Sequence, residues 1–277
     1  MEAGGKIIVL LPGPPHELEA ICEKEVWPRL AARKRSYLAR RQLKTAGLTE
    51  SELEVMIEGL YPREPGLSLT VLASPGQIDL QVTSASSESA AEADARAEEL
   101  AGRLAGRLGL AVFSEDGADL ETVIGRLLAG RNQSVAVAES CTGGLISRRL
   151  TRVPGSSAYF WEGFITYGNK AKIARLGVPE DLIERHGAVS ADTAGAMAEG
   201  ARRTAGCDFG LAVTGIAGPT GATPEKPIGL VFCSVADARR VRVERWIFLG
   251  DRIRVQEQSA QKTLDMFRRR LLEDKDR

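Results

Sequence analysis

The stretch that decides the fold is Ser134-Val-Ala-Val-Ala-Glu-Ser-Cys-Thr-Gly-Gly-Leu145. It begins with small and β-branched apolar residues, which are typical of a short buried strand, and a helical run follows from Leu145 to Val153. A strand, a tight turn and a helix start expose backbone N–H groups at a point where the helix dipole favours an anion. Because the turn carries a carboxylate, two hydroxyls and a thiol, it is either a reaction centre or simply a capped helix start.

Length and composition narrow the classes of protein. With 277 residues, 43% of them hydrophobic, the chain is long enough for two ordinary domains, or for one large domain and a smaller one. Lys+Arg and Asp+Glu are both 37, so no charge excess favours nucleic acid or an anionic membrane as a partner. No apolar run could span a bilayer and no signal peptide is evident, so we expect a cytoplasmic protein. Four separated cysteines and two histidines support neither a disulfide framework nor a structural zinc site.

The first residues do not make a complete domain. The run Lys6 to Leu11 predicts a buried strand, which Pro12-Gly-Pro-Pro15 ends before a helix from His16 to Leu30. One strand and one helix cannot bury a core, so this segment reads as the end of another domain or as a docked strand. The basic segment from Arg29 to Lys44 is interpreted as a solvated connector. A nucleic-acid patch is the alternative, weakened because Tyr37 is its only aromatic residue.

Residues 36–116 predict a small α+β module. Thr49 and Glu52 have the spacing of a capping box, which begins a helix that runs to about Tyr61. The later elements are a hairpin of Leu67–Leu72 and Gln77–Thr83, a long helix from Ser87 to Gly109, and a last strand at Ala111–Phe113. No cluster of polar residues in this module suggests chemistry.

From Asp119 onward, helices and strands alternate. The expected strands are Ser134–Ala138, Ala158–Tyr167, Phe209–Val213, Ile228–Val235 and Val241–Phe248, and the expected helices are Leu120–Gly130, Leu145–Val153, Lys170–Leu176, Ser190–Thr204 and Arg252–Leu272. This order predicts an α/β fold: a three-layer α/β/α C-terminal domain preceded by the small α+β module. Glycines follow several of the strands, where such folds bind their ligands.

Four loop segments carry reactive groups: Glu139–Gly144, Tyr167–Lys172, His186–Ser190 and Thr214–Gly221. Hydroxyls paired with a lysine, in a chain with two histidines, favour a Ser/Lys nucleophile assisted by a tyrosine over a Ser-His-Asp triad. A buried lysine can be neutral near pH 7 and accept a hydroxyl proton, but spacing does not choose between Lys170 and Lys172. The glycine loop could hold a phosphate, yet it lacks the Gly-Lys-Ser/Thr of a nucleoside-triphosphate site.

These four segments, together with Gly155-Ser-Ser157 and Lys226-Pro-Ile-Gly229, resemble in order the signatures of the CinA C-terminal domain, the nicotinamide-nucleotide amidohydrolase family. The resemblance covers about residues 118 to 273. Residues 36–116 are similar to the KH-like middle module of CinA proteins, and Leu11 to Leu18 resembles the last loop of their molybdopterin-binding-like domain. The resemblance therefore implies three parts of the chain: residues 1–35 as the remnant of the molybdopterin-binding-like domain, residues 36–116 as the KH-like module and residues 117–277 as the C-terminal domain. Because most of the first domain is missing from this sequence, its ADP-ribose pyrophosphatase activity is not expected.

The resemblance implies hydrolysis of the carboxamide of nicotinamide mononucleotide, a pyridine nucleotide, to nicotinic acid mononucleotide and ammonia. It assigns Ser140 as the nucleophile, activated by Lys172 and Tyr167, with N–H groups around Thr142 to Gly144 stabilising the oxyanion. Cys141 is the rival nucleophile, since a thiolate at a helix start has a lowered pKa. His186 is interpreted as a turn residue. The implied substrate-binding residues are Glu139, Thr142, Gly143, Gly144, Ser190, Thr214, Gly215, Gly218 and Arg252.

The same resemblance sets expectations about partners. No cofactor and no metal is expected, and neither nucleic acid nor a membrane is an expected partner. Family members and the apolar run around Trp161 indicate a homo-oligomer, most simply a dimer. Arg252 is expected at the substrate phosphate, although a salt bridge at a helix start explains it equally well. The alternative function is a non-catalytic nucleotide-binding protein, or one associated with competence or DNA damage.

Overall fold

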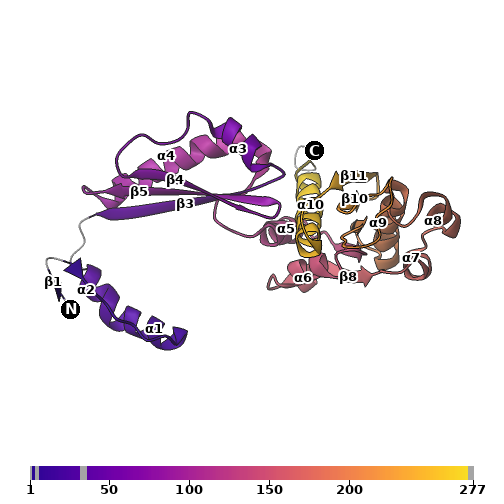
Figure 1. Ribbon diagram of the computed structural model, residues 1–277, viewed down its shortest axis with the longest axis horizontal. Coiled ribbons are helices and arrows are strands. Elements are labelled where there is room, and N and C mark those ends of the chain that lie inside the picture. Colours follow the sequence, from indigo (N-terminus) through magenta and orange to yellow (C-terminus); the bar gives the residue numbers. More distant parts are fainter. Residues whose placement is uncertain (1, 4–5, 32–35, 274–277) are drawn as a thin grey trace.

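The computed structural model describes residues 2–3, 6–31 and 36–273. Within them Figure 1 shows three parts: an N-terminal helical segment, a four-stranded sheet with two helices, and a five-stranded sheet with helices on both faces. The N-terminal segment lies at the end of the four-stranded sheet that is remote from the C-terminal domain. No helix in the described ranges is long and apolar enough to cross a membrane.

The C-terminal domain is built around strand β7 (Val135–Glu139). The order of its sheet is β11-β10-β9-β7-β8, and β7 runs parallel to both of its neighbours, β8 (Phe160–Ile165) and β9 (Phe209–Gly215). Strand β10 (Leu230–Ala236) pairs antiparallel with β9, and strand β11 (Val241–Ile247) pairs antiparallel with β10. A strand buried on both faces is expected to be largely apolar, and all five residues of β7 are buried, with Glu139 at its end as the one charged residue among them.

Alternation along β7 supplies two cores, one on each face of the sheet. Val135 and Val137 pack in the core with helices α5 (Leu120–Ala129), α6 (Leu145–Thr151) and α10 (Arg252–Glu273). Ala136 and Ala138 pack in the core with α7 (Asn169–Leu176), α8 (Glu180–His186) and α9 (Ala191–Ala205). The three-layer α/β/α prediction is therefore confirmed.

One helix of this domain begins at the cap predicted from the sequence, and another helix was not predicted. Ser190 caps α9 by accepting a hydrogen bond from the backbone N–H of Thr193 at 3.2 Å. Helix α8 was not predicted. It begins directly after Pro179, and a proline favours a helix start. With seven residues, however, the helix is too short to show a helical period in the sequence.

The smaller module is an antiparallel sheet in the order β4-β5-β3-β6, with strands β3 (Tyr37–Ala46), β4 (Leu67–Ser74), β5 (Gln77–Ser86) and β6 (Val112–Ser114). Helices α3 (Glu50–Ile57) and α4 (Ala90–Leu108) bury their apolar residues against it. The capping box of Thr49 and Glu52 is present. The turn between β4 and β5 is Pro75-Gly76, where Gly76 has a φ of +73°, a conformation that favours glycine.

The basic segment is not a solvated connector from Tyr37 onward, because those residues form strand β3 and pair with β5 along its whole length. Arg41 is paired with Asp94 and Glu98 of α4 at 2.8 and 2.5 Å, and Lys44 with Asp119 at 2.7 Å. These ion pairs weaken the alternative of a nucleic-acid patch. Residues 33–35, which carry three of the cations, lie outside the described residues.

The N-terminal prediction needs a correction. Strand β2 covers only Lys6–Ile7 and pairs with β1 (Glu2–Ala3), whereas a buried strand to Leu11 was expected. The residues after β2 are exposed, Leu10 by 84%, because nothing in the described chain covers this apolar run. The expected helix is present as α1 (Pro15–Ile21), a π-helical stretch (Cys22–Val26) and α2 (Trp27–Ala31).

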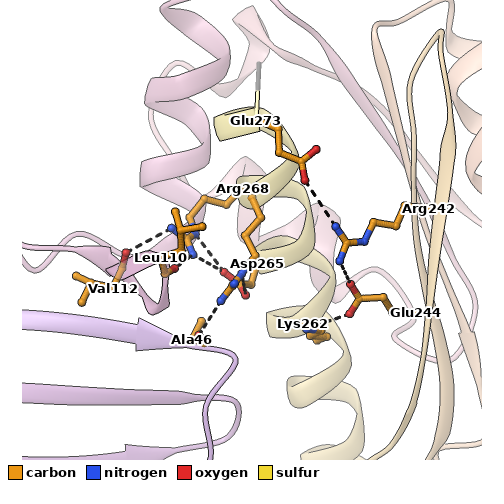
Figure 2. Close-up of polar contacts among 10 residues, drawn as sticks. Ala46, Leu110, Val112, Arg242, Glu244, Lys262, Asp265, Arg268 and Glu273 are labelled. Atoms are coloured by element: carbon orange, nitrogen blue, oxygen red, sulfur yellow. Dashed lines mark hydrogen bonds and ion pairs between the residues drawn. The ribbon is translucent and has the colours of Figure 1, made fainter. Parts of the chain in front are cut away.

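Helix α10 joins the C-terminal domain to the smaller module. Figure 2 shows Arg268, itself paired with Asp265, reaching the carbonyl oxygens of Leu110 and Val112 at 2.6 and 3.4 Å. Arg269 donates to the carbonyl oxygen of Ala46 at 3.3 Å. Arginines in the C-terminal half of α10 thus hold the module through hydrogen bonds to backbone carbonyl oxygens. Such hydrogen bonds from a charged donor are stronger than those between neutral groups.

Candidate active site

Strand register places three hydroxyls side by side at the carboxyl ends of the parallel strands. Glu139 is level with Ile165 of β8 and Val213 of β9, so the next residues, Ser140, Thr166 and Thr214, form a row across β8, β7 and β9. All three are buried. Ligands of open α/β sheets bind at this edge, so the row is the natural floor of a reaction centre.

Lys172 reaches this row from α7. Its Nζ lies 3.2 Å from Ser140 Oγ, 2.8 Å from the carbonyl oxygen of Thr166 and 3.2 Å from that of Tyr167. Lys172 is only 1% exposed, whereas Lys170 is exposed to solvent. The structure therefore selects Lys172, the choice that spacing left open.

Burial lowers the pKa of Lys172, because a charged amine loses its hydration in the interior. Among the described residues, its hydrogen-bond partners are two carbonyls and a hydroxyl, with no carboxylate to hold the charge. A neutral amine has two N–H groups and one lone pair. With both N–H groups on the carbonyls of Thr166 and Tyr167, the lone pair faces Ser140 Oγ and can accept its proton.

Cys141 lies on the other side of the backbone. It packs in the same core as Val135 and Val137, and burial raises the pKa of its thiol to about 12. The expected lowering by the helix start is absent because desolvation is the larger effect. Cys141 is therefore protonated at neutral pH, and the geometry favours Ser140 as the nucleophile.

Glu139 holds the turn together. Its Oε2 accepts from Thr142 Oγ1, Gly144 N and Ile146 N at 2.7, 3.0 and 3.1 Å, and its Oε1 accepts from both the backbone and the hydroxyl of Ser147. The side chain is fully buried. The Glu139 carboxylate and the hydroxyl hydrogen of Thr142 are thus engaged at the start of α6, where the helix dipole favours a negative charge.

Two of the backbone N–H groups expected to stabilise an oxyanion are already hydrogen-bonded. The N–H of Gly143 donates to the carbonyl oxygen of Ser140 at 3.2 Å, and that of Gly144 is held by Glu139. Within the described residues, no oxygen accepts from the N–H groups of Cys141 and Thr142, which directly follow Ser140. These two N–H groups are the available donors. Gly143 and Gly144 shape the turn through φ values of +60° and +103°.

Two hydrogen bonds of Arg252 hold Tyr167 and Gly218 together. Arg252 donates to the Tyr167 hydroxyl at 3.0 Å and to the carbonyl oxygen of Gly218 at 2.8 Å. Tyr167 is 60% exposed, and its hydroxyl bonds to Arg252 instead of to Ser140 or Lys172 as expected. The tyrosine contributes to the lysine through its backbone carbonyl. For Arg252, the structure gives these two acceptors rather than a salt bridge.

Ser190 and Thr214 support the loop beside the row. Ser190 Oγ donates to the carbonyl oxygen of Gly187 at 3.1 Å, and Thr214 Oγ1 to that of Ala188 at 2.8 Å. Gly215 is required by packing, since a Cβ there would lie 2.7 Å from the carbonyl oxygen of Leu230. His186 is the last residue of helix α8 and is exposed, whereas a turn residue was expected.

Two residues of the site were not anticipated. Thr166 stands beside Ser140, and its buried hydroxyl has no hydrogen-bond partner in the part of the chain that the structure describes. Gln256 of α10 donates from Nε2 to the carbonyl oxygen of Cys141 at 2.7 Å. A polar residue at the end of a predicted strand was the only signal for Thr166, and no local signal could place Gln256, which is remote in sequence.

The protein is thus of the α/β class: its C-terminal domain has three α/β/α layers and carries a buried serine–lysine pair at the carboxyl ends of its parallel strands. The chain belongs to the CinA family. Residues 117–271 match the family model of the CinA C-terminal domain, and residues 40–114 match that of the KH domain of damage-inducible protein CinA. The family predicted from the sequence motifs is confirmed.

Individual relatives agree with this assignment. CinA-like proteins of Solibacter usitatus and Koribacter versatilis are each 42% identical, over 98% and 96% of this chain, which spans 65% and 64% of their own lengths. Among solved structures, competence/damage inducible protein CihA of Agrobacterium tumefaciens is 39% identical with a TM-score of 0.53, covering 53% of this chain and 91% of that one. A CinA superfamily protein of Klebsiella pneumoniae is 29% identical with a TM-score of 0.54, covering 56% and 96%.

Proposed function

We propose that this chain hydrolyses the carboxamide of nicotinamide mononucleotide to nicotinic acid mononucleotide and ammonia. The observation that carries the proposal is the buried pair of Ser140 and Lys172, with 3.2 Å between Oγ and Nζ. A hydroxyl next to a desolvated amine is an activated nucleophile suited to acyl transfer. Membership of the CinA family supports the same reaction.

The first half of the reaction forms an ester on Ser140. Neutral Lys172 takes the hydroxyl proton while Ser140 Oγ attacks the carboxamide carbon, and the carbonyl oxygen becomes an oxyanion. The free N–H groups of Cys141 and Thr142 stabilise that oxyanion. Lys172, now an ammonium, returns the proton to the amide nitrogen as the C–N bond breaks, and ammonia leaves.

The second half releases the acid. A water molecule gives a proton to Lys172 and attacks the ester carbon, forming a second oxyanion at the same N–H groups. When the C–O bond to Ser140 breaks, Lys172 returns the proton to Ser140 Oγ, and nicotinic acid mononucleotide departs. The amine serves first as a base and then as an acid in each half, which requires a pKa near the working pH.

The mouth of the site offers a place for the nucleotide phosphate. Arg252 is exposed and holds the Tyr167 hydroxyl and the carbonyl oxygen of Gly218, so its guanidinium is fixed where a phosphate could replace one of these acceptors. The glycine loop that begins at Gly215 adjoins it.

Ammonia release from nicotinamide mononucleotide tests the proposal. Wild type should release ammonia, whereas Ser140→Ala and Lys172→Met should each lose about 10²-fold or more of kcat. Lys170→Met is the matched control, because this exposed lysine lies two residues away on the same helix. No release from wild type, with a folded chain, would instead support a non-catalytic nucleotide-binding protein. Undiminished release from Ser140→Ala would exclude the serine mechanism.

A further inference from the structure

A cleft separates the smaller module from the C-terminal domain. Its volume is about 620 Å³, within the range of roughly 300–1,000 Å³ that small-molecule sites occupy. One wall consists of the loop after β3 and the turn Ser74–Gln77, and the other of the end of β11 and one face of α10. Figure 2 shows three residues that border it, Ala46, Lys262 and Asp265. Neither Ser140 nor Lys172 lines this cleft.

The β11 wall is aromatic and flat. Trp246 and Phe248 share one face of the strand, with ring planes 7° apart and centroids separated by 6.1 Å. Lys262 Nζ lies 4.2 Å from the centre of the Trp246 ring. Trp246 remains 36% exposed and Leu249 82%. Parallel rings beside a cation are suited to a planar heteroaromatic ligand.

The α10 wall is polar and carries positive charge. Arg254, Gln258 and Lys262 are spaced by four residues, so they share one helix face and span about 12 Å. No acceptor in the described chain binds the Arg254 guanidinium. Lys262 shares the carboxylate of Glu244 with Arg242, at 3.1 and 2.7 Å, and Arg242 also lies 3.7 Å from Glu273.

Most of the acidic residues in the cleft are already engaged. Glu52 caps Thr49, and Asp265 is held by Arg268 and Arg269. The described residues contain no group of three or more metal-ligating side chains, so a metal ion is not the natural occupant. A ligand with a planar ring at one end and an anion at the other fits the two walls together.

We propose that this cleft is a second ligand site, which binds a nucleotide. The ring packs against Trp246 and Phe248, and the phosphate lies between Arg254 and Lys262. Gln261, which donates to Gln77 Oε1 across the cleft at 3.3 Å, has an amide that can turn to pair with the edge of the ring. The site is independent of the reaction proposed for Ser140.

Calorimetric titration of the whole chain with adenosine monophosphate tests this site, because that nucleotide has no carboxamide to hydrolyse. We expect saturable binding, with adenosine alone and inorganic phosphate alone each bound at least about tenfold more weakly. Trp246→Ala and Arg254→Ala should each weaken binding by about tenfold or more, as loss of ring stacking or of a charged contact does. Thermal unfolding of each variant verifies that it is folded.

Matched controls separate the cleft from the rest of the surface. Trp161→Ala removes an exposed tryptophan on β8, and Arg245→Ala removes an exposed arginine next to Trp246 but on the opposite face of β11. Both should bind as wild type does, and so should Ser140→Ala. Absence of saturable binding at millimolar nucleotide, or full binding by folded Trp246→Ala and Arg254→Ala, overturns the proposal whether or not the chain is an amidohydrolase.

Discussion

Gln256 on α10 donates a hydrogen bond of 2.7 Å to the carbonyl oxygen of Cys141, the residue directly after the proposed nucleophile. The amide therefore fixes the peptide that carries one of the two free N–H groups beside Ser140. We predict that Gln256→Met lowers kcat for nicotinamide mononucleotide by about tenfold with little change in KM, since a loosened oxyanion donor affects mainly the transition state. Gln258→Met is the control, because among the described residues the Gln258 side chain bonds only to the carbonyl oxygens of Leu249 and Arg254. Equal losses in both variants would contradict a positioning role.

The lowered pKa of Lys172 predicts two pH effects. Activity should rise with pH through that lowered value, because the neutral amine is the base. The folded chain binds the Lys172 proton less firmly than the unfolded chain does. The contribution of Lys172 to the free energy of unfolding therefore increases as the pH is raised from its lowered pKa to the ordinary pKa of 10.5.

Urea unfolding of wild type and Lys172→Met at several pH values measures the second effect. The variant lacks the buried amine, so its advantage in stability over wild type should shrink as the pH is raised from neutral toward about 10. A difference that stays constant over this range would show that Lys172 is charged in the folded chain.

Cys141 should be dispensable for the reaction. Its pKa of about 12 leaves almost no thiolate at neutral pH, and its side chain is 5% exposed. We predict that Cys141→Ala keeps kcat within about threefold, with a stability loss of roughly 1 kcal/mol from the cavity left in the core. The native protein should resist alkylation at Cys141 until it is unfolded. Rapid alkylation of Cys141 accompanied by loss of activity would instead indicate that the thiol is the nucleophile.

Glu139 should matter for stability as well as for activity. Its carboxylate accepts five hydrogen bonds at the start of α6, so Glu139→Gln replaces an acceptor by a donor that opposes several N–H groups. We expect a loss of about 2–4 kcal/mol in the free energy of unfolding by urea. Glu162→Gln, at an exposed position on β8, should change it by less than about 0.5 kcal/mol.

Arg268 should hold the smaller module on α10. Arg268→Met leaves the carbonyls of Leu110 and Val112 and the buried carboxylate of Asp265 without this donor, which should cost about 3 kcal/mol. Arg269→Met should cost less, because Arg269 is partly exposed and Asp265 keeps Arg268. Limited proteolysis around residues 115–118 measures separation of the two parts. Equal protection of both variants and wild type would argue against this contact as the attachment.

Local patterns were enough to predict much of the secondary structure and the three-layer class. The capping box at Thr49, the cap at Ser190 and the apolar strand before Glu139 depend on neighbours in sequence, and each appears where expected. Strand β3 was misread because it carries charged side chains on both faces, with Arg40 exposed and Arg41 half-buried beside α4, and this obscured the period of two. The short helix α8 gave too few turns to be seen.

The sequence by itself determined that a strand, a tight turn and a helix start present Ser140, and that lysine is the available base in a chain poor in histidine. Only the tertiary structure brought Lys172 rather than Lys170 to Ser140 and buried the Cys141 thiol in the core, because both depend on packing between distant segments, and that burial shifts both pKa values. Tertiary structure also turned Tyr167 toward Arg252, engaged Glu139 with α6, and placed Thr166 and Gln256 beside the nucleophile. Those contacts join residues that strand register and helix packing bring together, so no local pattern could reveal them.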